Sequence, residues 1–500
     1  MADPDVLVVG AGSAGCVLAA RLSEAAACEV LLLEAGPDLR SRMPPEVRSG
    51  WRPTRGFDWG YASEPDEYGV VRELPRGRLV GGCSSTNATV ALRGSPADYD
   101  AWAEAGNQGW TFEELLPYFV RLESDEDFGD RAWHGDAGPL PIRRYQADEL
   151  TDVAAASLEA FDSLGLPRVA DHNAPGAVGA GPAPVNCRDG TRMSTALTYL
   201  PPRGRDNLTV RCEAEVARLV LDGTRAVGVR LTSGEELRSR RVVLCAGAYG
   251  SPTLLLRSGV GPASELAKLG VPVKLDLPGV GCNLIDHPSV SVRIPYRSTP
   301  DPAPLFQVVA TLRSDGSSPR DPPDLQLLTA GPYPAEGGEP PWFMLAAALL
   351  KPRSRGQLSL RSGDPTEPPS IRLGYLTEQI DVDRLAQGLE RAEELAAHPA
   401  FRALAATEAA TAGDSPPRAD ERRDWVRRNC WTYHHVVGTC AMGADSDPAA
   451  VVDARGRVHG GEGLYVVDAS VMPDVPSANT HIPTVMVAER LAEMLAAELR

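Results

Sequence analysis

A glycine-rich segment near the N-terminus could bind the phosphates of a dinucleotide. Gly10, Gly12 and Gly15 form a G-x-G-x-x-G pattern that also contains Ser13 and Ala14. The first glycine permits a tight turn, the second lets the backbone approach a pyrophosphate, and the third lets a helix pack closely on a strand. The free N–H groups and the positive end of the following helix would then face the phosphates.

A carboxylate follows at the position where such a segment needs one. Glu34 lies 19 residues after Gly15 and could accept hydrogen bonds from both hydroxyls of an adenosine ribose. A 2′-phosphate would be repelled there, which excludes NADP. The glycine pattern alone leaves NAD and FAD open, but the sequence Glu34-Ala35-Gly36 and the long non-helical stretch after it favour FAD.

The histidines are the other residues that could carry chemistry. An imidazole has an unperturbed pKa of about 6.5, so it can accept a proton from a hydroxyl group near neutral pH. The chain has eight histidines, and no two of them stand four residues apart or cluster with cysteines or carboxylates at metal-ligand spacing. We therefore expect no metal site.

The elements that must position these residues begin with a β-α-β unit. The apolar runs 5–10 and 29–34 predict two strands buried on both faces of a parallel sheet, and residues 13–25 predict the helix between them. Further strands are predicted at 208–211, 215–221, 226–231 and 241–246, with Asp222-Gly223 as a hairpin turn. Further helices are predicted at 98–104, at 111–122 and from Thr484 to the end.

The region 299–341 is punctuated by proline and glycine, and it is accompanied by strand-like runs at 325–329 and 344–349. We predict an α/β protein, with a Rossmann-like (β-α-β) FAD-binding domain and a second α+β substrate-binding domain built on an antiparallel sheet. The predicted FAD-binding domain is discontinuous and covers residues 1–40, 76–150, 200–295 and 450–500. The substrate-binding domain and its lid excursions cover residues 41–75, 151–199 and 296–449.

Composition limits the partners. The chain has 500 residues, 43% hydrophobic and 23% charged, so it can bury a sizeable core. Its net charge of −17 argues against nucleic acid or an anionic membrane surface as partner. No apolar run reaches the roughly 18–20 residues of a membrane span, and no secretory signal is evident. Nine cysteines without a C-x-x-C pair indicate a reduced, cytoplasmic protein.

Several blocks resemble one known family. The blocks 77–88 (GRLVGGCSSTNA), 247–261, 278–288 (PGVGCNLIDHP), 435–439 and 464–484 occur in order along essentially the whole chain. Together they resemble the glucose–methanol–choline (GMC) family of FAD-dependent oxidoreductases, in particular its bacterial aryl-alcohol-oxidase-like and hydroxymethylfurfural-oxidase-like members.

The resemblance implies an FAD site. Backbone groups of 87–90 would lie near the flavin, Val216 would hold the adenine, and Asp468 would face the pyrophosphate unless it caps a helix instead. Thr86 stands where some members carry a histidine bonded to the flavin, so we expect non-covalent FAD. The implied FAD contacts are Gly10, Gly12, Ser13, Ala14, Gly15, Glu34, Ala35, Val80, Gly82, Asn87, Ala88, Thr89, Val90, Val216, Asp468, Ala469, Pro483 and Thr484.

The resemblance also implies a reaction. His435 would be the base and His481 a hydrogen-bond partner of the substrate oxygen, with His434 as a competing candidate, while His134 and His287 would hold loops together. The expected substrate is a primary alcohol, aromatic or otherwise activated, and the electron acceptor is oxygen or another species. A hydroxynitrile lyase and a non-catalytic flavin-binding protein are the alternatives. The aromatic residues that could line the substrate pocket are Trp51, Trp59, Trp342, Phe343, Trp431 and Tyr433.

Overall fold

The predicted β-α-β unit lies at the centre of a five-stranded sheet. The computed structural model describes residues 3–200, 204–335, 339–406 and 421–499. In it, β1 (Val6–Val9), α1 (Ser13–Leu22) and β2 (Val30–Leu33) follow one another as the sequence predicts. The strand order is β22-β12-β1-β2-β8, and every pairing is parallel. The edge strands are β8 (Leu208–Arg211) and β22 (Leu464–Val466), and β12 (Arg241–Leu244) lies between β22 and β1.

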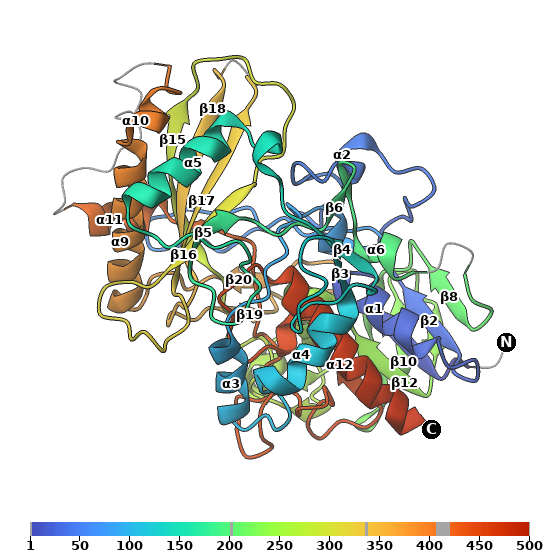
Figure 1. Cartoon of the computed structure of the whole chain (residues 1–500). Coiled ribbons are helices and arrows are strands. Elements are labelled where there is room, and N and C mark those ends of the chain that lie inside the picture. Colours follow the sequence, from blue (N-terminus) through green and yellow to red (C-terminus); the bar gives the residue numbers. More distant parts are fainter. Residues whose placement is uncertain (1–2, 201–203, 336–338, 407–420, 500) are drawn as a thin grey trace.

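The C-terminal helix covers this sheet together with α1. Helix α12 (His481–Leu499) packs against α1, and α4 (Phe112–Leu122) packs against α12 (Figure 1). Helix α12 begins three residues before the predicted start at Thr484, because a proline such as Pro483 is tolerated in the first helical turn. A three-stranded antiparallel sheet lies beside α7 (Gly247–Arg257), and the predicted turn at Asp222-Gly223 joins two of its strands. These strands are β9 (Val216–Asp222), β10 (Arg225–Leu231) and β11 (Glu236–Arg238).

A six-stranded antiparallel sheet forms the second part of the molecule, in the order β21-β15-β18-β17-β16-β5 (Figure 1). Its strands are β5 (Gly179–Pro182), β15 (Pro288–Pro295), β16 (Val308–Leu312), β17 (Leu325–Tyr333), β18 (Trp342–Leu349) and β21 (Trp431–Thr432). Helices lie against one face of it: α5 (Asp152–Ser163), α9 (Gln379–Ala396), α10 (Pro399–Arg402) and α11 (Arg422–Asn429).

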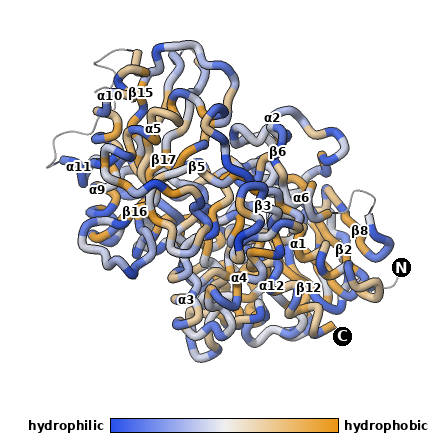
Figure 2. Tube along the Cα trace, viewed as in Figure 1, coloured by the Kyte–Doolittle hydropathy of each residue, from blue (hydrophilic) through white to orange (hydrophobic). Residues whose placement is uncertain are grey.

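The two faces of this sheet have different neighbours. Leu327 of β17 and Leu345 of β18 belong to the core beneath the helices. On the opposite face, Leu328, Ala330 and Ala346 form a small cluster against which Tyr433 packs. Side chains alternate between faces along a strand, so the same two strands serve both layers. Figure 2 shows hydrophobic residues concentrated on the strands of both sheets.

One predicted domain boundary does not coincide with a sheet boundary. Strand β15 lies in the predicted FAD-binding segment 200–295, but it pairs with β18 and β21 in the antiparallel sheet. We therefore propose that the boundary lies before Pro288, and the other domain limits stay predictions.

The remaining elements are short, and within the described residues no helix combines the length and hydropathy of a membrane crossing. The short helices are α2 (Pro45–Arg48), η1 (Gly82–Ser85), α3 (Pro96–Glu104), η2 (Ala147–Glu149), α6 (Thr195–Thr198), α8 (Ala263–Lys268) and η4 (Ala469–Val471). The short strands are β3 (Glu123–Asp125), β4 (Leu140–Ile142), β6 (Cys187–Arg188), β7 (Thr191–Arg192), β13 (Val260–Gly261), β14 (Leu275–Asp276), β19 (Gln357–Ser359) and β20 (Ser370–Arg372).

Candidate active site

The three glycines of the N-terminal turn meet different surroundings. A Cβ added to Gly10 would lie 2.6 Å from the Cys245 carbonyl oxygen, and one added to Gly15 would lie 1.9 Å from the Gly10 carbonyl oxygen. Gly12 differs, because the nearest atom to its Cβ outside its chain neighbours is the Cys245 carbonyl oxygen at 4.0 Å. Gly10 and Gly15 therefore permit close packing, whereas Gly12 borders open space.

Helix α1 begins at this turn without a side-chain cap. Gly12 is the N-cap residue, and the first N–H bonded within the helix is that of Cys16, which donates to the Gly12 carbonyl. The N–H groups of Ser13, Ala14 and Gly15 belong to the first turn, where a helix has no internal acceptors. The turn thus offers backbone donors and a positive dipole end to an anionic group.

Glu34 directly follows β2 and lies beside the glycine turn. Its two carboxylate oxygens accept hydrogen bonds of 2.9 Å each from the backbone N–H groups of Ala11 and Gly36. Burial raises the pKa of Glu34 to about 7, against the opposing effect of these hydrogen bonds. A carboxylate oxygen has two lone pairs, so hydrogen bonds from ribose hydroxyls can be added to both oxygens.

The loop 77–90 lies against the glycine turn. A Cβ added to Gly82 would lie 2.8 Å from the Cα of Gly12. Gly81 donates to the Ala11 carbonyl at 2.7 Å, and the N–H of Val80 donates to the Pro37 carbonyl at 3.0 Å. The structure therefore brings Val80 and Gly82 together with the G-x-G-x-x-G segment.

The end of this loop, which contains Ala88, has an unusual backbone. Thr89 has a φ of 60°, which is strained for a β-branched residue. Its N–H donates to the Asn87 side-chain oxygen at 3.0 Å, and its hydroxyl donates to the Gly50 carbonyl at 3.1 Å. Val90 then pairs with Val185. Such strain, held by surrounding contacts, is typical of ligand-binding loops.

Asp468 acts as a cap. It follows β22, and its carboxylate accepts from the N–H of Ser470 at 2.8 Å and from the N–H of Gly247 at 2.9 Å. These bonds match the capping role that the sequence left open for this residue. Its neighbour Ala469 begins η4, and Val216 begins β9.

Helix α12 starts at His481, so Pro483 and Thr484 lie in its first turn. The Thr484 hydroxyl donates to the Thr480 carbonyl at 2.6 Å. Contacts of Pro483, Thr484, Val216, Asp468 and Ala469 with FAD stay predictions.

His435 is the centre of a second constellation, which three chain segments build. Its Nδ1 lies 3.0 Å from Nδ1 of His287, and its Nε2 lies 3.1 Å from Nδ2 of Asn479. The Tyr433 ring lies 4.3 Å from the His435 ring, measured between centroids. The ring is buried, with 8% of the residue exposed.

Asp286 holds two of these segments together. One of its carboxylate oxygens accepts from the N–H groups of His435 (2.7 Å) and His287 (2.8 Å). The other accepts from the hydroxyls of Thr432 and Tyr375. With four donors, this buried carboxylate fixes the backbone from which both imidazoles project.

His481 stands apart from these bonds. Among the described residues, neither of its ring nitrogens has a hydrogen-bond partner, and both are inaccessible to solvent. Asn479, two residues earlier, contacts His435, so the chain brings 479–481 to that side chain, but no hydrogen bond joins His481 to His435. A buried imidazole without a protein partner is available to a ligand.

The side chains of His434, His435 and His481 are neutral near pH 7. Burial, together with His287, His434 and Arg76, holds the pKa of His435 well below its usual range. Burial lowers the pKa of His481 to about 4. Burial, assisted by Arg76, lowers the pKa of His434 to about 3. A neutral imidazole can accept a proton, so each can act as a base or a hydrogen-bond acceptor.

The sequence missed two contacts of His435. His287 was assigned to loop packing, but its ring bonds directly to His435, and Asn479 received no role. Both lie in the blocks 278–288 and 464–484, so the signal was present but did not specify contact. The competing His434 is half-buried in a left-handed conformation (φ 65°), and its carbonyl accepts from Arg76.

The aromatic candidates mostly lie elsewhere. Tyr433 contacts His435, but Phe343 is on the helix-covered face of the sheet and stacks on Phe401. Trp431 is 39% exposed. Phe343 thus lies on the face opposite to Tyr433, and a pocket-lining role for Trp431 stays a prediction. The other three candidates stack or pack against Tyr333 (Trp342), Tyr61 (Trp59) and the Tyr145 cluster (Trp51).

A buried group of charges surrounds His134. Glu123, Asp125 and His134 place ligand-type atoms within 4.8 Å of one another. Arg93 already pairs with Glu123, Arg144 with Asp125, and His134 itself contacts Glu123 at 2.6 Å. The carboxylates are thus neutralised by protein cations, and the loop-holding role expected for His134 fits these bonds.

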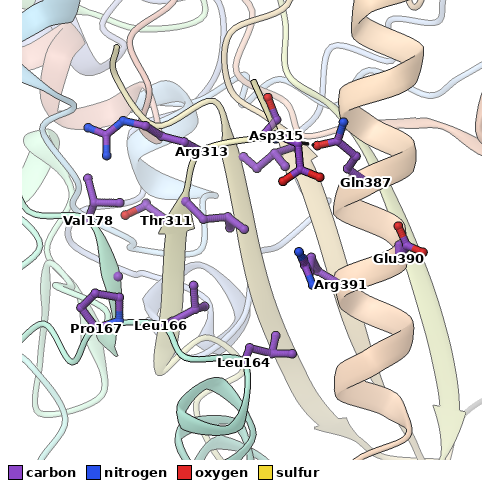
Figure 3. Close-up of a pocket in the computed structure, with 14 residues that line it drawn as sticks. Leu164, Leu166, Pro167, Val178, Thr311, Arg313, Asp315, Gln387, Glu390 and Arg391 are labelled. Carbon is purple, nitrogen blue, oxygen red and sulfur yellow. Dashed lines mark hydrogen bonds between the residues drawn. The ribbon is translucent and has the colours of Figure 1, made fainter. Parts of the chain in front are cut away.

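A cavity of about 430 Å³ lies at the far edge of the antiparallel sheet (Figure 3). Leu166, the end of β16 around Arg313, and Gln387 and Glu390 of α9 line it. None of the predicted site residues contributes to it.

The residues of the N-terminal turn and the histidine constellation fit an FAD molecule. The open space at Gly12, the uncapped start of α1 and the Glu34 carboxylate suit its pyrophosphate and ribose. In the part of the chain that the structure describes, both ring nitrogens of His481 and the side-chain oxygen of Asn479 lack a hydrogen-bond partner, so polar groups of a ligand could bind there.

Comparisons with known proteins identify the family. Two GMC oxidoreductase profiles, N-terminal and C-terminal, match residues 4–289 and 352–488. The chain is 37% identical to 5-(hydroxymethyl)furfural oxidase of Methylovorus sp. (strain MP688), over 98% of each chain. It is 36% identical to mitochondrial choline dehydrogenase of Mus musculus, over 98% of this chain and 89% of that one.

A solved structure agrees with these relatives. The crystal structure of pyridoxine 4-oxidase from Mesorbium loti matches with a TM-score of 0.90 and 34% identity, over 98% of this chain and 99% of that one. Its agreement confirms the predicted α/β fold with separate parallel and antiparallel sheets. The chain therefore belongs to the GMC oxidoreductase family and is an FAD-dependent oxidoreductase.

Proposed function

We propose that the protein oxidises a primary alcohol on an aromatic or otherwise activated carbon to the aldehyde, using non-covalently bound FAD. The observation that carries the proposal is the buried, neutral His435 beside Asn479, Tyr433 and the segment of His481. Two relatives support the substrate class by name, a 5-(hydroxymethyl)furfural oxidase and a pyridoxine 4-oxidase.

His435 and His481 act on the hydroxyl group of the substrate in different ways. When bound, FAD supplies the acceptor for the two electrons and the hydrogen that leave the alcohol carbon. His435 Nε2 accepts the hydroxyl proton, sharing or replacing its contact with Asn479. His481 donates a hydrogen bond to the same oxygen from a ring nitrogen that has no partner among the described residues.

An anaerobic screen tests this function. Benzyl alcohol and furanic alcohols should bleach the absorbance of the bound flavin, and admission of air should restore it, with peroxide formed if oxygen is the acceptor. A hydroxynitrile lyase would turn over its substrate and leave the flavin oxidised. The proposal is wrong if no primary alcohol reduces the flavin.

The loss of kcat/KM on the acid side of the pH profile should occur at an unusually low pH. Since burial holds the pKa of His435 well below 6.5, the base is already neutral at pH 6.5. We expect kcat/KM for benzyl alcohol to be constant from pH 8 to 6.5 and to fall only at lower pH. Circular dichroism at each pH will separate this fall from unfolding. A half-maximal value above pH 6.5 would contradict the assignment of His435 as base.

Replacing Gly12 with alanine should weaken FAD binding about 10–100-fold, the effect of roughly 1–3 kcal/mol of steric conflict. The added methyl group enters open space in the protein, so the apoprotein should keep its Tm. Titration of apoprotein with FAD measures the Kd. Gly363→Ala is the matched control, because Gly363 is exposed and its Cβ would lie 3.4 Å from the nearest atom. Equal affinity in both variants would contradict the proposed pyrophosphate contact.

A further inference from the structure

His287 is a buried histidine that contacts the proposed base, His435, at Nδ1 and not at Nε2. It directly precedes β15, and its ring lies edge-on to His435, with centroids 5.2 Å apart and planes at 86°. The residue has no exposed surface. Its Nδ1 is 3.0 Å from Nδ1 of His435, within hydrogen-bond distance.

One hydrogen must lie between these two nitrogens. Burial, with the nearby Lys351 ammonium, lowers the pKa of His287 to about 3, and His435 is neutral as well. A neutral imidazole has one N–H and one lone pair. Either His435 donates from Nδ1 and keeps its lone pair on Nε2, or His287 donates and His435 carries its hydrogen on Nε2.

The contact between Asn479 and His435 distinguishes these two arrangements of the hydrogens. The atom that faces His435 Nε2 is the amide nitrogen, 3.1 Å away, and an amide nitrogen only donates. Nε2 must therefore present its lone pair, and the hydrogen of His435 lies on Nδ1.

The same arrangement fixes the hydrogen of His287. Its Nδ1 accepts from Nδ1 of His435, so a neutral His287 carries its own hydrogen on Nε2, which is inaccessible to solvent.

We propose that His287 is a positioning residue that holds His435 in the tautomer with hydrogen on Nδ1 and the lone pair on Nε2, where the substrate hydroxyl must donate. The role rests on the proposed function of His435 as base. It resembles the way a second hydrogen bond selects the reactive nitrogen of other functional histidines.

Nitrogen NMR tests the tautomer without turnover. The FAD-loaded protein is labelled with ¹⁵N in histidine, and the His435 signals are assigned by their loss in His435→Ala. We expect a pyrrole-type Nδ1 and a pyridine-type Nε2 for His435. A pyridine-type Nδ1 would overturn the proposal.

A pair of variants of nearly equal shape tests the consequence. Asn can place an acceptor oxygen where His287 has Nδ1, whereas Leu cannot. His287→Leu should lower kcat for benzyl alcohol about 10–100-fold, the loss typical when a partner that orients an imidazole is removed, with little change in KM. His287→Asn should restore most of it and keep the Nδ1 signal pyrrole-type.

The outcomes separate this inference from the proposed function. If the wild type reduces no flavin with any alcohol, the function fails while the nitrogen shifts still decide the tautomer. If His287→Leu does not fold, the wild type and His287→Asn spectra still decide it. Equal kcat in the Leu and Asn variants would overturn the positioning role.

Discussion

Replacing His435 with alanine will lower kcat/KM for benzyl alcohol by about 10²–10⁴-fold, the usual contribution of a general base. The variant leaves the hydroxyl proton without the acceptor that the Asn479 and His287 contacts orient. His435 is not among the predicted FAD contacts, so the variant should still bind FAD. Rapid-mixing measurement of flavin reduction without oxygen reports the effect directly.

Two further variants make this result specific. His398→Asn removes an imidazole far from the reaction and keeps a side chain able to cap α10, as His398 does through its Nδ1. It should reduce the flavin at the wild-type rate. If instead His434→Ala loses activity and His435→Ala keeps it, the competing histidine is the base and our assignment is wrong.

Replacing His134 with alanine will destabilise the protein by about 3–5 kcal/mol, the cost of leaving a buried charge without its partner. His134 donates to Glu123 at 2.6 Å and to Asp171 at 2.9 Å, and it is 4% exposed. Arg93 and Arg144 supply two positive charges against the carboxylates of Glu123, Asp125 and Asp171. Protonated His134 balances the third carboxylate.

The pH dependence of this loss has a defined sign. Burial alone would lower the pKa of His134, but the hydrogen bonds to Asp171 and Glu123 outweigh it and raise the pKa above 6.5. The contribution of His134 is therefore complete below pH 6.5 and is lost as pH rises through the raised pKa. Urea unfolding at pH 6 and at higher pH should show a smaller difference between wild type and variant at the higher pH.

A double variant controls for simple loss of packing. Asp171→Asn removes one of the carboxylates that His134 balances, so adding it to His134→Ala should cost less than the sum of the two single losses. Strict additivity would mean that the charges are not coupled.

The sequence predicted the β-α-β unit at the centre of the parallel sheet because the signals of that unit are local. The runs at β1 and β2 are continuous and apolar, as buried parallel strands require, and the glycine pattern sets the turn between β1 and α1. The boundary before β15 was missed because pairing partners, not composition, decide to which sheet a strand belongs. β15 pairs with β18, more than fifty residues later in the chain.

The sequence predicted only those residues of the candidate site that lie in recognisable motifs. His435 and His481 lie in recognisable blocks, and Asn479 brings their segments into contact. That His287 contacts His435, and that Phe343 faces the helices, depend on how β15 and β18 cross the molecule. Such orientations follow from strand register, which a single sequence does not reveal when both faces of a sheet are buried.

The alternation of side chains along β17 and β18 has a consequence for redesign. Leu328, Ala330 and Ala346 pack beside Tyr433, whereas their neighbours Leu327 and Leu345 support the helices behind the sheet. Libraries restricted to these three positions would vary the volume next to Tyr433, whose ring contacts the proposed base His435, and leave the supporting layer intact. The two faces of the sheet thereby separate positions that can be varied near Tyr433 from positions that support the helices.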